Sequence, residues 1–471
     1  MQELLESRHV ILMANGTCAT HCLFISLKYL HSEITTIYVP NNCYIAAINT
    51  LLYEYEMQNI ELMKMDEDTW NVNTKEDYIL SLKPNSAVLI VHNLGNIVNV
   101  PRLKTLRPDL VFLEDNCEGL FGKYQGTYSG VSDSTLCSSV SFYGNKIITT
   151  GEGGAFCTNN TLLYEHIKKV YSQGMSSRRY LHDVHAYNYR MTNVQAAFLY
   201  DQLTDLTTIL AKKRTVFETY EKMLQRLICI GKVKLFEREH TTQPADWIFA
   251  LRIVGNLKTV DETYAFFKSN GVDTRPFFYP LYSHKHLSAL KNEDMIPEML
   301  NKEVIMIPSS PSITVGEQQK VVGSIHLFVL YNQNIGVVSA SESDVSDFLP
   351  KINSPHFRYF NSRSVDCIQH HVCTFLFKDL VSNEVFAYTH IDYDEESSRN
   401  WFGIYIVPTY RGKKYGEIIM DYTLQSFKDR CKTIYLSVDI SNHSAIKLYE
   451  KYGFVVECEN QEKKIQLMKY L

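Results

Sequence analysis

The sequence predicts an α/β protein. We expect a large domain with a mostly parallel sheet, a small α+β domain, and a further α+β domain at the C-terminal end. Short apolar runs alternate with helix-like stretches in the first half of the chain, which favours parallel strands joined by crossover helices. A long helical pattern follows at residues 192–227, and a strand–helix pattern restarts after residues 331–336. These breaks predict domains at residues 1–205, 206–332 and 333–471.

The composition is that of an ordinary globular protein. The 471 residues suggest about three structural units. A net charge of −5 argues against a nucleic-acid binder with a broad basic face. The 11 cysteines occur singly, without zinc-ligand spacing, which predicts reduced thiols, a cytoplasmic location and no metal site. The apolar run at residues 10–14 is too short for a signal core or a membrane span, so we expect no membrane contact.

Each predicted element follows from local periodicity. In the first half, residues 35–39, 86–91 and 110–113 read as buried strands, and residues 17–30 and 46–56 as helices. Residues 192–227 repeat apolar positions every three or four residues, which predicts one long helix. The small domain is expected to hold a strand at 247–254, a helix at 261–270 and a proline-rich turn at 275–280.

The last part of the chain has its own series of elements. Strands are predicted at 373–378, 384–391, 401–407, 433–438 and 465–470. Helices are predicted at 342–352, from about Gly412, and at 442–451. No internal repeat or low-complexity tract interrupts them.

Three pieces of the first half suit one cofactor, pyridoxal phosphate. Lys146 follows a strand pattern and precedes a glycine-rich turn, Asp115 ends a buried strand, and Gly16-Thr17 opens a helix. The cofactor needs a lysine to bind it, a carboxylate at its ring nitrogen, and donors for its phosphate. Each piece alone is commonplace: a lone lysine is usually on the surface, and an aspartate after a strand is often a cap. The occurrence of all three in one chain is what indicates pyridoxal phosphate.

The region at residues 8–325 resembles the DegT-type sugar aminotransferases, which are fold-type I enzymes that use pyridoxal phosphate. The resemblance lies in five segments, at residues 15–19, 40–44, 114–118, 141–154 and 188–197, and in later segments at 275–281 and 307–309. The segment at 141–154, with its Gly-Glu-Gly-Gly tail, is the most specific. Only fourteen residues precede Asn15, fewer than the family usually has.

The resemblance implies a role for each site residue. Lys146 would hold the cofactor and move the proton during transamination, and Asp115 would keep the ring nitrogen protonated. Tyr44 would stack on the ring, and Glu118 would lie near the ring hydroxyl. The phosphate would be held by residues from two chains of a homodimer: Gly16, Thr17, Cys18 and Ser141, with Asn188 from the partner.

A second group of residues suits an acyl-CoA site. A strand ends at residues 406–408, a basic turn follows, and a helix begins, so free backbone N–H groups can meet a pyrophosphate. Asn442 can cap a later helix that carries Tyr449. By itself the basic turn could equally be an ordinary loop. The two segments together make residues 334–471 resemble the GNAT acetyltransferase superfamily.

This second resemblance implies that acetyl-CoA is a cosubstrate. Tyr449 would donate a proton to the departing thiolate, and the backbone of Ile406 and Val407 would hold the pantetheine and the acyl carbonyl. The remaining acetyl-CoA contacts would be Arg411, Gly412, Lys413, Lys414, Tyr415, Gly416 and Asn442. Lys414 stands where the family pattern has a glycine. The general base is left open among His390, Asp392 and Asp439, each of which reads more readily as a surface residue.

The two halves together predict two consecutive steps. A nucleotide-linked 4-keto-6-deoxy sugar would receive an amine from glutamate and then an acetyl group from acetyl-CoA. The segment at 275–281 resembles enzymes that aminate at C4, such as perosamine and viosamine synthases; UDP or dTDP is favoured, with GDP open. Two alternatives remain: the acetyltransferase domain acts on a different amine, or the first domain is a degenerate scaffold or sensor.

Overall fold

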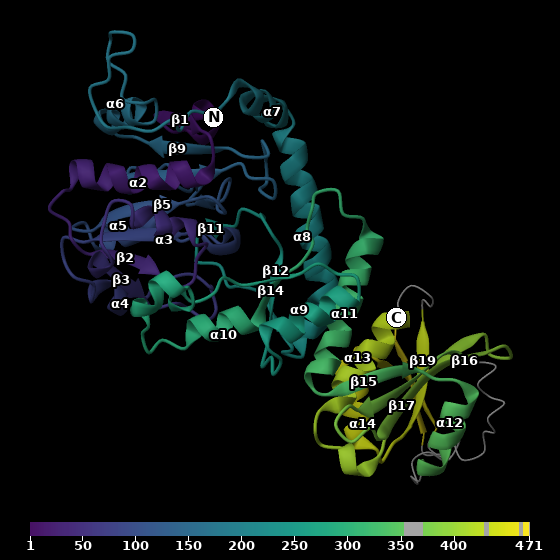
Figure 1. The fold of residues 1–471 in the computed structure, drawn as a ribbon. Coiled ribbons are helices and arrows are strands. Elements are labelled where there is room, and N and C mark those ends of the chain that lie inside the picture. Colours follow the sequence, from purple (N-terminus) through teal and green to yellow (C-terminus); the bar gives the residue numbers. More distant parts are fainter. Residues whose placement is uncertain (353–370, 428–432, 461–464, 471) are drawn as a thin grey trace. The chain divides into compact units, whose positions relative to one another are not determined.

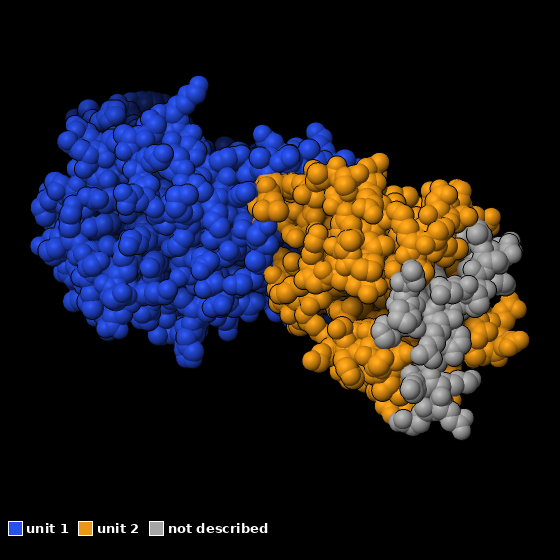
Figure 2. Space-filling view, turned by 90° about the horizontal axis from the view of Figure 1, so that it is seen from below, with its two compact units in different colours: residues 1–222, 233–255, 259–318 blue, residues 223–232, 256–258, 319–471 orange. Residues whose placement is uncertain are grey.

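The computed structural model describes residues 1–352, 371–427, 433–460 and 465–470, and it divides into two compact units (Figure 2). Unit 1 contains residues 1–222, 233–255 and 259–318. Unit 2 contains residues 223–232, 256–258 and the described part of 319–471. Each unit buries its own apolar side chains.

The main sheet of unit 1 has seven strands in the order β1-β9-β8-β5-β4-β2-β3 (Figure 1). Neighbours from β8 to β3 are parallel, whereas β9 runs antiparallel to both β8 and β1. The strands are β1 (His9–Met13), β2 (Ile37–Pro40), β3 (Ile60–Met63), β4 (Ala87–Val91), β5 (Val111–Asp115), β8 (Cys137–Ser141) and β9 (Gly154–Thr158).

Helices cover both faces of this sheet, which explains why β2, β4, β8 and β9 are buried along their whole length. In β5, Leu113 faces a core cluster that includes α2, α3 and α6, whereas Phe112 faces a cluster that includes α4 and α5. These helices are α2 (Gly16–Leu30), α3 (Ala46–Leu51), α4 (Glu76–Leu80), α5 (Val100–Leu106) and α6 (Thr161–Val170), after a first turn α1 (Gln2–Leu5).

The rest of unit 1 is a smaller mixed region. Its antiparallel sheet has the order β10-β12-β14-β13, and a three-stranded sheet has the order β11-β6-β7. The strands are β6 (Lys123–Tyr124), β7 (Thr127–Tyr128), β10 (Val233–Lys234), β11 (Thr242–Gln243), β12 (Ala250–Ile253), β13 (Arg275–Pro276) and β14 (Val304–Met306). The helices are α7 (Asn193–Thr204), α8 (Leu206–Cys229), α9 (Val260–Ser269), α10 (Ile296–Glu303) and α11 (Val315–Asn332); the last turns of α8 and most of α11 belong to unit 2.

Unit 2 is built on one sheet in the order β15-β16-β17-β18-β19-β21-β20. Figure 1 labels β15, β16, β17 and β19 of this sheet. All the neighbouring strands in this order are antiparallel except β18 and β19, which are parallel. The strands are β15 (Ile335–Ser339), β16 (His371–Asp379), β17 (Val385–Asp394), β18 (Arg399–Ile406), β19 (Ile434–Asp439), β20 (Val455–Asn460) and β21 (Ile465–Tyr470); the helices are α12 (Glu342–Phe348), α13 (Tyr415–Phe427) and α14 (His443–Lys451). Short 3₁₀ turns across both units are η1 (Met57–Asn59), η2 (Asn93–Gly95), η3 (Leu281–Ser283), η4 (Lys285–Leu290), η5 (Leu349–Lys351) and η7 (Pro408–Tyr410).

The α/β class and most predicted elements are confirmed, but several boundaries are wrong. The helix expected at 342–352 ends at Phe348, where the 3₁₀ turn η5 follows, and the strand expected at 247–254 begins only at Ala250. The single helix expected at 192–227 is two helices, because Asp205 leaves the helical conformation between α7 and α8. The helix expected at 46–56 ends at Leu51; Tyr53 beyond it is 64% exposed, so little packing favours a longer helix. The helix expected from Gly412 begins at Tyr415, because Gly412 and Lys414 both have positive φ. None of the described helices is long and apolar enough to cross a membrane.

Candidate active sites

A cavity of about 660 Å³ opens in unit 1 at the carboxyl ends of β4, β5 and β8. Val91, Asp115 and Ser141 line it from the ends of these three strands, and the first residues of α2 line it as well. This is the edge at which parallel α/β sheets bind ligands.

The start of α2 forms one wall of the cavity. Asn15 caps the helix, because its side-chain oxygen accepts a hydrogen bond from the Cys18 N–H at 2.9 Å. Gly16 lies against Ser141, and a Cβ at Gly16 would be 2.7 Å from the Cβ of Ser141. Only glycine permits this close approach, which places the free N–H groups of α2 beside the Ser141 hydroxyl. Thr17 is exposed to the cavity mouth.

Asp115 faces the cavity from the end of β5 and is 7% exposed. Its Oδ1 accepts hydrogen bonds from the Cys117 N–H at 3.0 Å and from the Ser139 hydroxyl at 3.4 Å. These two donors fix the direction of the carboxylate.

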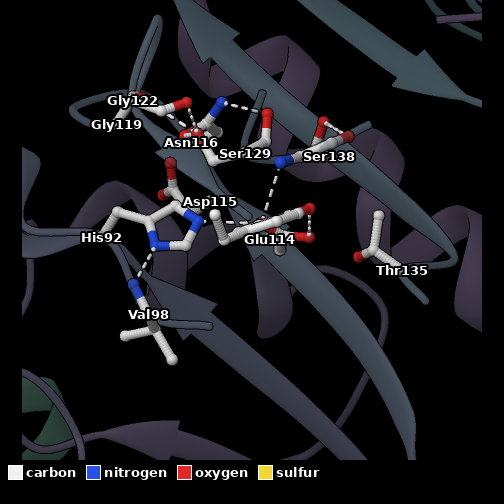
Figure 3. A network of polar contacts seen from close by, with 12 residues as sticks. His92, Val98, Glu114, Asp115, Asn116, Gly119, Gly122, Ser129, Thr135 and Ser138 are labelled. Atoms are coloured by element: carbon white, nitrogen blue, oxygen red, sulfur yellow. Dashed lines mark hydrogen bonds and ion pairs between the residues drawn. The ribbon is translucent and has the colours of Figure 1, made fainter. Parts of the chain in front are cut away.

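A polar network surrounds the neighbouring Glu114, which is fully buried (Figure 3). Val98 N–H donates to His92 Nδ1 at 3.2 Å, so the ring proton is on Nε2, which donates to Glu114 at 2.8 Å. Gly130 N–H and the Tyr124 hydroxyl also donate to Glu114. Glu114 is therefore a hydrogen-bonded carboxylate that anchors the end of β5, and it lies outside the cavity lining.

Lys146 reaches into the same cavity. Its Nζ lies 3.8 Å from Glu118 Oε1 and 3.9 Å from the centre of the Trp247 ring. The Trp247 indole N–H donates to the Asn145 carbonyl at 2.9 Å, which fixes the ring beneath the amine. Burial raises the pKa of the Glu118 carboxyl to about 7, against the opposing effect of Lys146.

The structure brings most of the expected cofactor residues together in this cavity. Gly16, Thr17, Tyr44, Asp115, Glu118, Ser141 and Lys146 all line it, and Cys18 contributes its backbone to the cap of α2. Tyr44 is 60% exposed at the rim. Asn188 is exposed, bonds to Arg190, and is not part of the lining within its own chain.

Sequence reasoning missed two residues that shape the site. Trp247 was expected only as the start of a strand, although the centre of its ring lies 3.9 Å from Lys146 Nζ. Glu152 lines the cavity from the glycine-rich turn. No periodic pattern marks either residue, because both lie in irregular segments that only the tertiary fold brings to the site.

In unit 2, a gap opens between two parallel strands. Among the described residues, β18 and β19 pair only where Asn400 and Trp401 meet Ile434 and Tyr435. Val407 N–H donates to the Phe386 carbonyl on β17. Because successive residues of a strand direct their N–H and C=O groups to opposite edges, those of Ile406 point away from β17 and toward the gap. Ile406 therefore borders the gap, whereas the Val407 amide is engaged by β17.

The basic turn leads from this gap into α13. Arg411 Nε donates to the Ile406 carbonyl at 2.8 Å, and the Lys413 Nζ lies 4.8 Å from the Tyr410 ring. Lys414 has φ of +61°, the left-handed conformation that glycine adopts most easily. The lysine thus keeps the turn geometry despite replacing the expected glycine, and Tyr415 and Gly416 begin the helix.

Tyr449 lies in the apolar core on the α13 face of the sheet. It is 9% exposed, and burial raises the pKa of its phenol. Asn442 caps α14 by accepting a hydrogen bond from the Ala445 N–H at 3.3 Å. The phenol therefore keeps its proton at neutral pH, as a general acid must.

The surface interpretation of the acid–base candidates is wrong for two of the three. His390 is 4% exposed and Asp392 is 8% exposed; the rings of His371 and Tyr388 pack against the His390 imidazole, which also lies against Gly403 on β18. Asp439 lies at the end of β19, where it accepts hydrogen bonds from the Ser441 hydroxyl and N–H in a local turn.

Comparison with protein families matches two models to the chain. Residues 1–326 match the DegT/DnrJ/EryC1/StrS aminotransferase family, and residues 337–454 match the acetyltransferase (GNAT) family. Both resemblances inferred from the sequence are confirmed.

Curated relatives and solved structures match the first part of the chain. GDP-perosamine synthase of Escherichia coli O157:H7 is 30% identical over 315 residues, covering 66% of this chain and 83% of the relative. A UDP-4-amino-4,6-dideoxy-N-acetyl-beta-L-altrosamine transaminase of Helicobacter pylori is 26% identical, covering 47% and 60%. The sugar aminotransferase CalS13 from Micromonospora echinospora has the same fold, with a TM-score of 0.61 and 19% identity over 69% of this chain and 88% of that one.

The raised pKa of Glu118 predicts a pH-dependent stability in the cofactor-free protein. Folding favours the protonated carboxyl, so this contribution is complete below the ordinary value of 4.5 and is lost as the pH rises through about 7. Glu118→Gln, which cannot ionise, should gain on the order of 2 kcal/mol over wild type between pH 5 and pH 8. In thermal unfolding, the melting temperature of Glu118→Gln relative to wild type should rise by a few degrees over that range.

The exposed Glu152→Gln, at the rim of the same cavity, is the matched control and should show no such change. A difference between Glu118→Gln and wild type that stays constant from pH 5 to pH 8 would contradict the assignment.

Proposed function

Because the chain belongs to the DegT/DnrJ/EryC1/StrS aminotransferase family and also carries a GNAT acetyltransferase domain, we propose that it catalyses two consecutive steps on one sugar. In the first, a nucleotide-linked 4-keto-6-deoxy sugar receives an amine from glutamate. In the second, acetyl-CoA acetylates that amine. The observation that carries the proposal is the pairing of the Lys146–Asp115 cavity with a separate acetyl-transfer gap in the same chain.

The cavity residues fit pyridoxal phosphate. Gly16 lets the start of α2 pack against Ser141, since a Cβ there would collide with Ser141, so the free N–H groups of the helix and the Ser141 hydroxyl can bind the same phosphate. Asp115 is a directed, buried carboxylate suited to a protonated ring nitrogen, and Lys146 is a partly buried amine in the same cavity. When bound, the cofactor supplies the electron-withdrawing ring on which amino groups are exchanged.

The protein's own groups then divide the work. Asp115 would hold a proton at the ring nitrogen, because a buried carboxylate favours a cation beside it. Lys146 Nζ, held above Trp247, would take and return the substrate proton. Glu118, whose pKa is about 7, can give or accept a proton close to the Lys146 amine.

The nature of the substrate is supported by the named relatives. One is named a GDP-perosamine synthase and another acts on a UDP-linked 4-amino-4,6-dideoxy sugar. Both names point to nucleotide-linked amino sugars, and they make GDP as well as UDP worth testing beside dTDP. Arg275 and His284 line the cavity at its small-domain side, where they can contact an anionic nucleotide sugar.

In the second step, acetyl-CoA would lie in the gap between β18 and β19. The Ile406 peptide would bind the pantetheine or acyl carbonyl, and the basic turn from Arg411 to Gly416 would meet the pyrophosphate. Tyr449 would protonate the departing sulfur.

The proposed domain division places the large domain at 1–205, the small domain at 206–332 and the acetyltransferase domain at 333–471. The first cut falls beside the end of α7 at Thr204, whereas the compact units divide within α11, with residues from Gln319 onward in unit 2. We further propose a cytoplasmic location, because the 11 cysteines occur singly along the chain, a usage typical of reduced thiols.

We also propose a homodimer formed by the first domain. Exposed apolar side chains gather on α7 and the segment before it: Met175, Tyr180, Leu181, Val184, Val194, Phe198 and Tyr200. Such a concentration is typical of a protein interface. A partner would also bring its Asn188 to the cavity, as the family resemblance implies.

The dimer predicts that Phe198→Asp, on the exposed face of α7, gives a monomer that binds pyridoxal phosphate weakly. The charge would be buried against the partner, which is unfavourable. Sedimentation and absorbance titration with the cofactor measure both effects. The matched control is Tyr53→Asp, an exposed aromatic outside the α7 cluster, which should remain a dimer. A fully active wild-type monomer would contradict the interface.

The two-step proposal predicts that the sites can be inactivated one at a time. Lys146→Ala should form no amino sugar yet acetylate amino sugar supplied from outside. Tyr449→Phe should accumulate amino sugar, with acetylation slowed on the order of 10²-fold. Mass spectrometry of the sugar products measures both, and Lys168→Ala, exposed on α6, is the unaffected control.

Two outcomes would separate the alternatives. If Lys146→Ala stays folded but loses acetylation of supplied amino sugar, the sites are not independent. If the wild type acetylates peptide amines and leaves the amino sugar unchanged, the GNAT domain has a different acceptor.

A further inference from the structure

Three polar side chains gather on one face of the unit 2 sheet: His371 on β16, with His390 and Asp392 on β17. His371 is paired with Asp392 across the two strands. The rings of His371 and His390 are stacked, with centroids 4.7 Å apart and an angle of 14° between planes. His390 Nε2 lies 4.0 Å from Asp392 Oδ1. We call these residues the His371–His390–Asp392 cluster.

The geometry of the cluster suits proton transfer better than metal binding. Its candidate ligand atoms lie within 4.8 Å of one another. A metal ion must lie in the plane of each imidazole, about 2.0–2.1 Å from the nitrogen. Two rings that are stacked nearly parallel have lone pairs that run side by side and do not converge on one ion. An imidazole beside a carboxylate is instead a common arrangement for a base.

Gly403 allows the imidazole to reach the strand that borders the acetyl-transfer gap. His390 is paired with Gly403 on β18. A Cβ at Gly403 would lie only 2.1 Å from His390 Cε1, so any other residue would displace the ring. The imidazole therefore lies directly over the backbone of β18, two residues beyond the point where β18 and β19 separate.

His390 and Tyr449 lie on opposite faces of the sheet. Ile391 packs with Tyr449 and with Met420 and Leu424 of α13 in one core cluster. Because side chains alternate along a strand, His390 points to the other face. Its neighbour there is Tyr388, which stacks on Phe348 of α12. An acyl group in the gap would thus have the acid on one side and the imidazole on the other.

We propose that His390 is the general base of acetyl transfer, with Asp392 and His371 as positioning residues. The inference rests on the acetyl transfer proposed above. His390 takes a proton from the acceptor ammonium, and the freed lone pair forms a C–N bond with the thioester carbon. The C–S bond breaks, and the sulfur keeps its electron pair and takes a proton from Tyr449. The nitrogen loses a second proton, which restores Tyr449, and the proton on His390 returns to solvent.

The test is steady-state acetylation by the full-length protein with acetyl-CoA and a panel of acceptors, amino sugars and peptide amines. His390→Gln should lower kcat on the order of 10²- to 10⁴-fold and leave the dissociation constant of acetyl-CoA unchanged. In a pH profile, the wild-type kcat should fall at low pH as the imidazole becomes protonated. This acid limb should be absent from the profile of His390→Gln. The titratable groups that face His390 from the described strands are His371, Tyr388 and Asp392.

Three further variants keep the test decisive. Asp392→Asn should lower kcat less than His390→Gln does and should shift the acid limb, since Asp392 only positions the His390 ring. Gly403→Ala removes no polar group but moves the ring, so it should also lower kcat while acetyl-CoA still binds. Asp439→Asn, the rival acid held in its turn by Ser441, should keep wild-type kcat.

A His390→Gln protein that binds acetyl-CoA and keeps wild-type kcat and acid limb would overturn the inference, as would loss of activity in Asp439→Asn alone. Transfer to peptide amines with no transfer to amino sugars would instead overturn the proposed function, and the His390 comparison would then be read on the peptide acceptor.

Discussion

A carboxylate removed from water is stable only when hydrogen-bond donors or a cation meet it, and this constraint organises the first active site. Glu114, Asp115 and Glu118 are all buried at the end of β5. Glu114 is met by His92, Gly130 and Tyr124 and so belongs to the scaffold. Asp115 and Glu118 face the cavity with fewer donors, and Glu118 lies 3.8 Å from the Lys146 amine. The Asp115 carboxylate favours a cationic ring nitrogen, while the free N–H groups at the start of α2 favour an anion.

The same logic explains how much of the site could be predicted from sequence. Asp115 and Gly16 stand at the ends of regular elements, and the topology of a parallel sheet brings such ends together. Lys146 lies in the irregular segment between β8 and β9, and its place in the same cavity was predicted from the motif around it. The place of Trp247 was not predicted, because this residue precedes β12 in an irregular segment and reaches Lys146 only through the tertiary fold. Helix limits at Leu51 and Asp205 were likewise set by packing and local conformation rather than by periodicity.

In unit 2 the strand pattern of β17 was predicted correctly, but the same pattern gave the wrong expectation for the burial of His390 and Asp392. His390 and Asp392 alternate with apolar residues on β17, as exposed polar residues on a half-buried strand would. Both side chains are nevertheless buried, and Gly403 on the next strand accommodates the imidazole. A glycine inside a strand often marks a close approach, and here the partner of that approach is a titratable ring. A single sequence does not reveal which strands pair. It is this pairing that brings isolated polar residues together as a cluster.

In the proposed function the chemistry of the two units is complementary, since one would produce a primary amine and the other would consume one. The most direct test of this account supplies the full-length protein with ¹⁵N-glutamate, trideuterated acetyl-CoA and GDP-, UDP- or dTDP-linked 4-keto-6-deoxy sugars. Mass spectrometry then follows the labels. The account predicts one sugar nucleotide that carries both the nitrogen and the acetyl label. A product that carries the nitrogen label alone, while the protein still transfers the acetyl group to another amine, would contradict it.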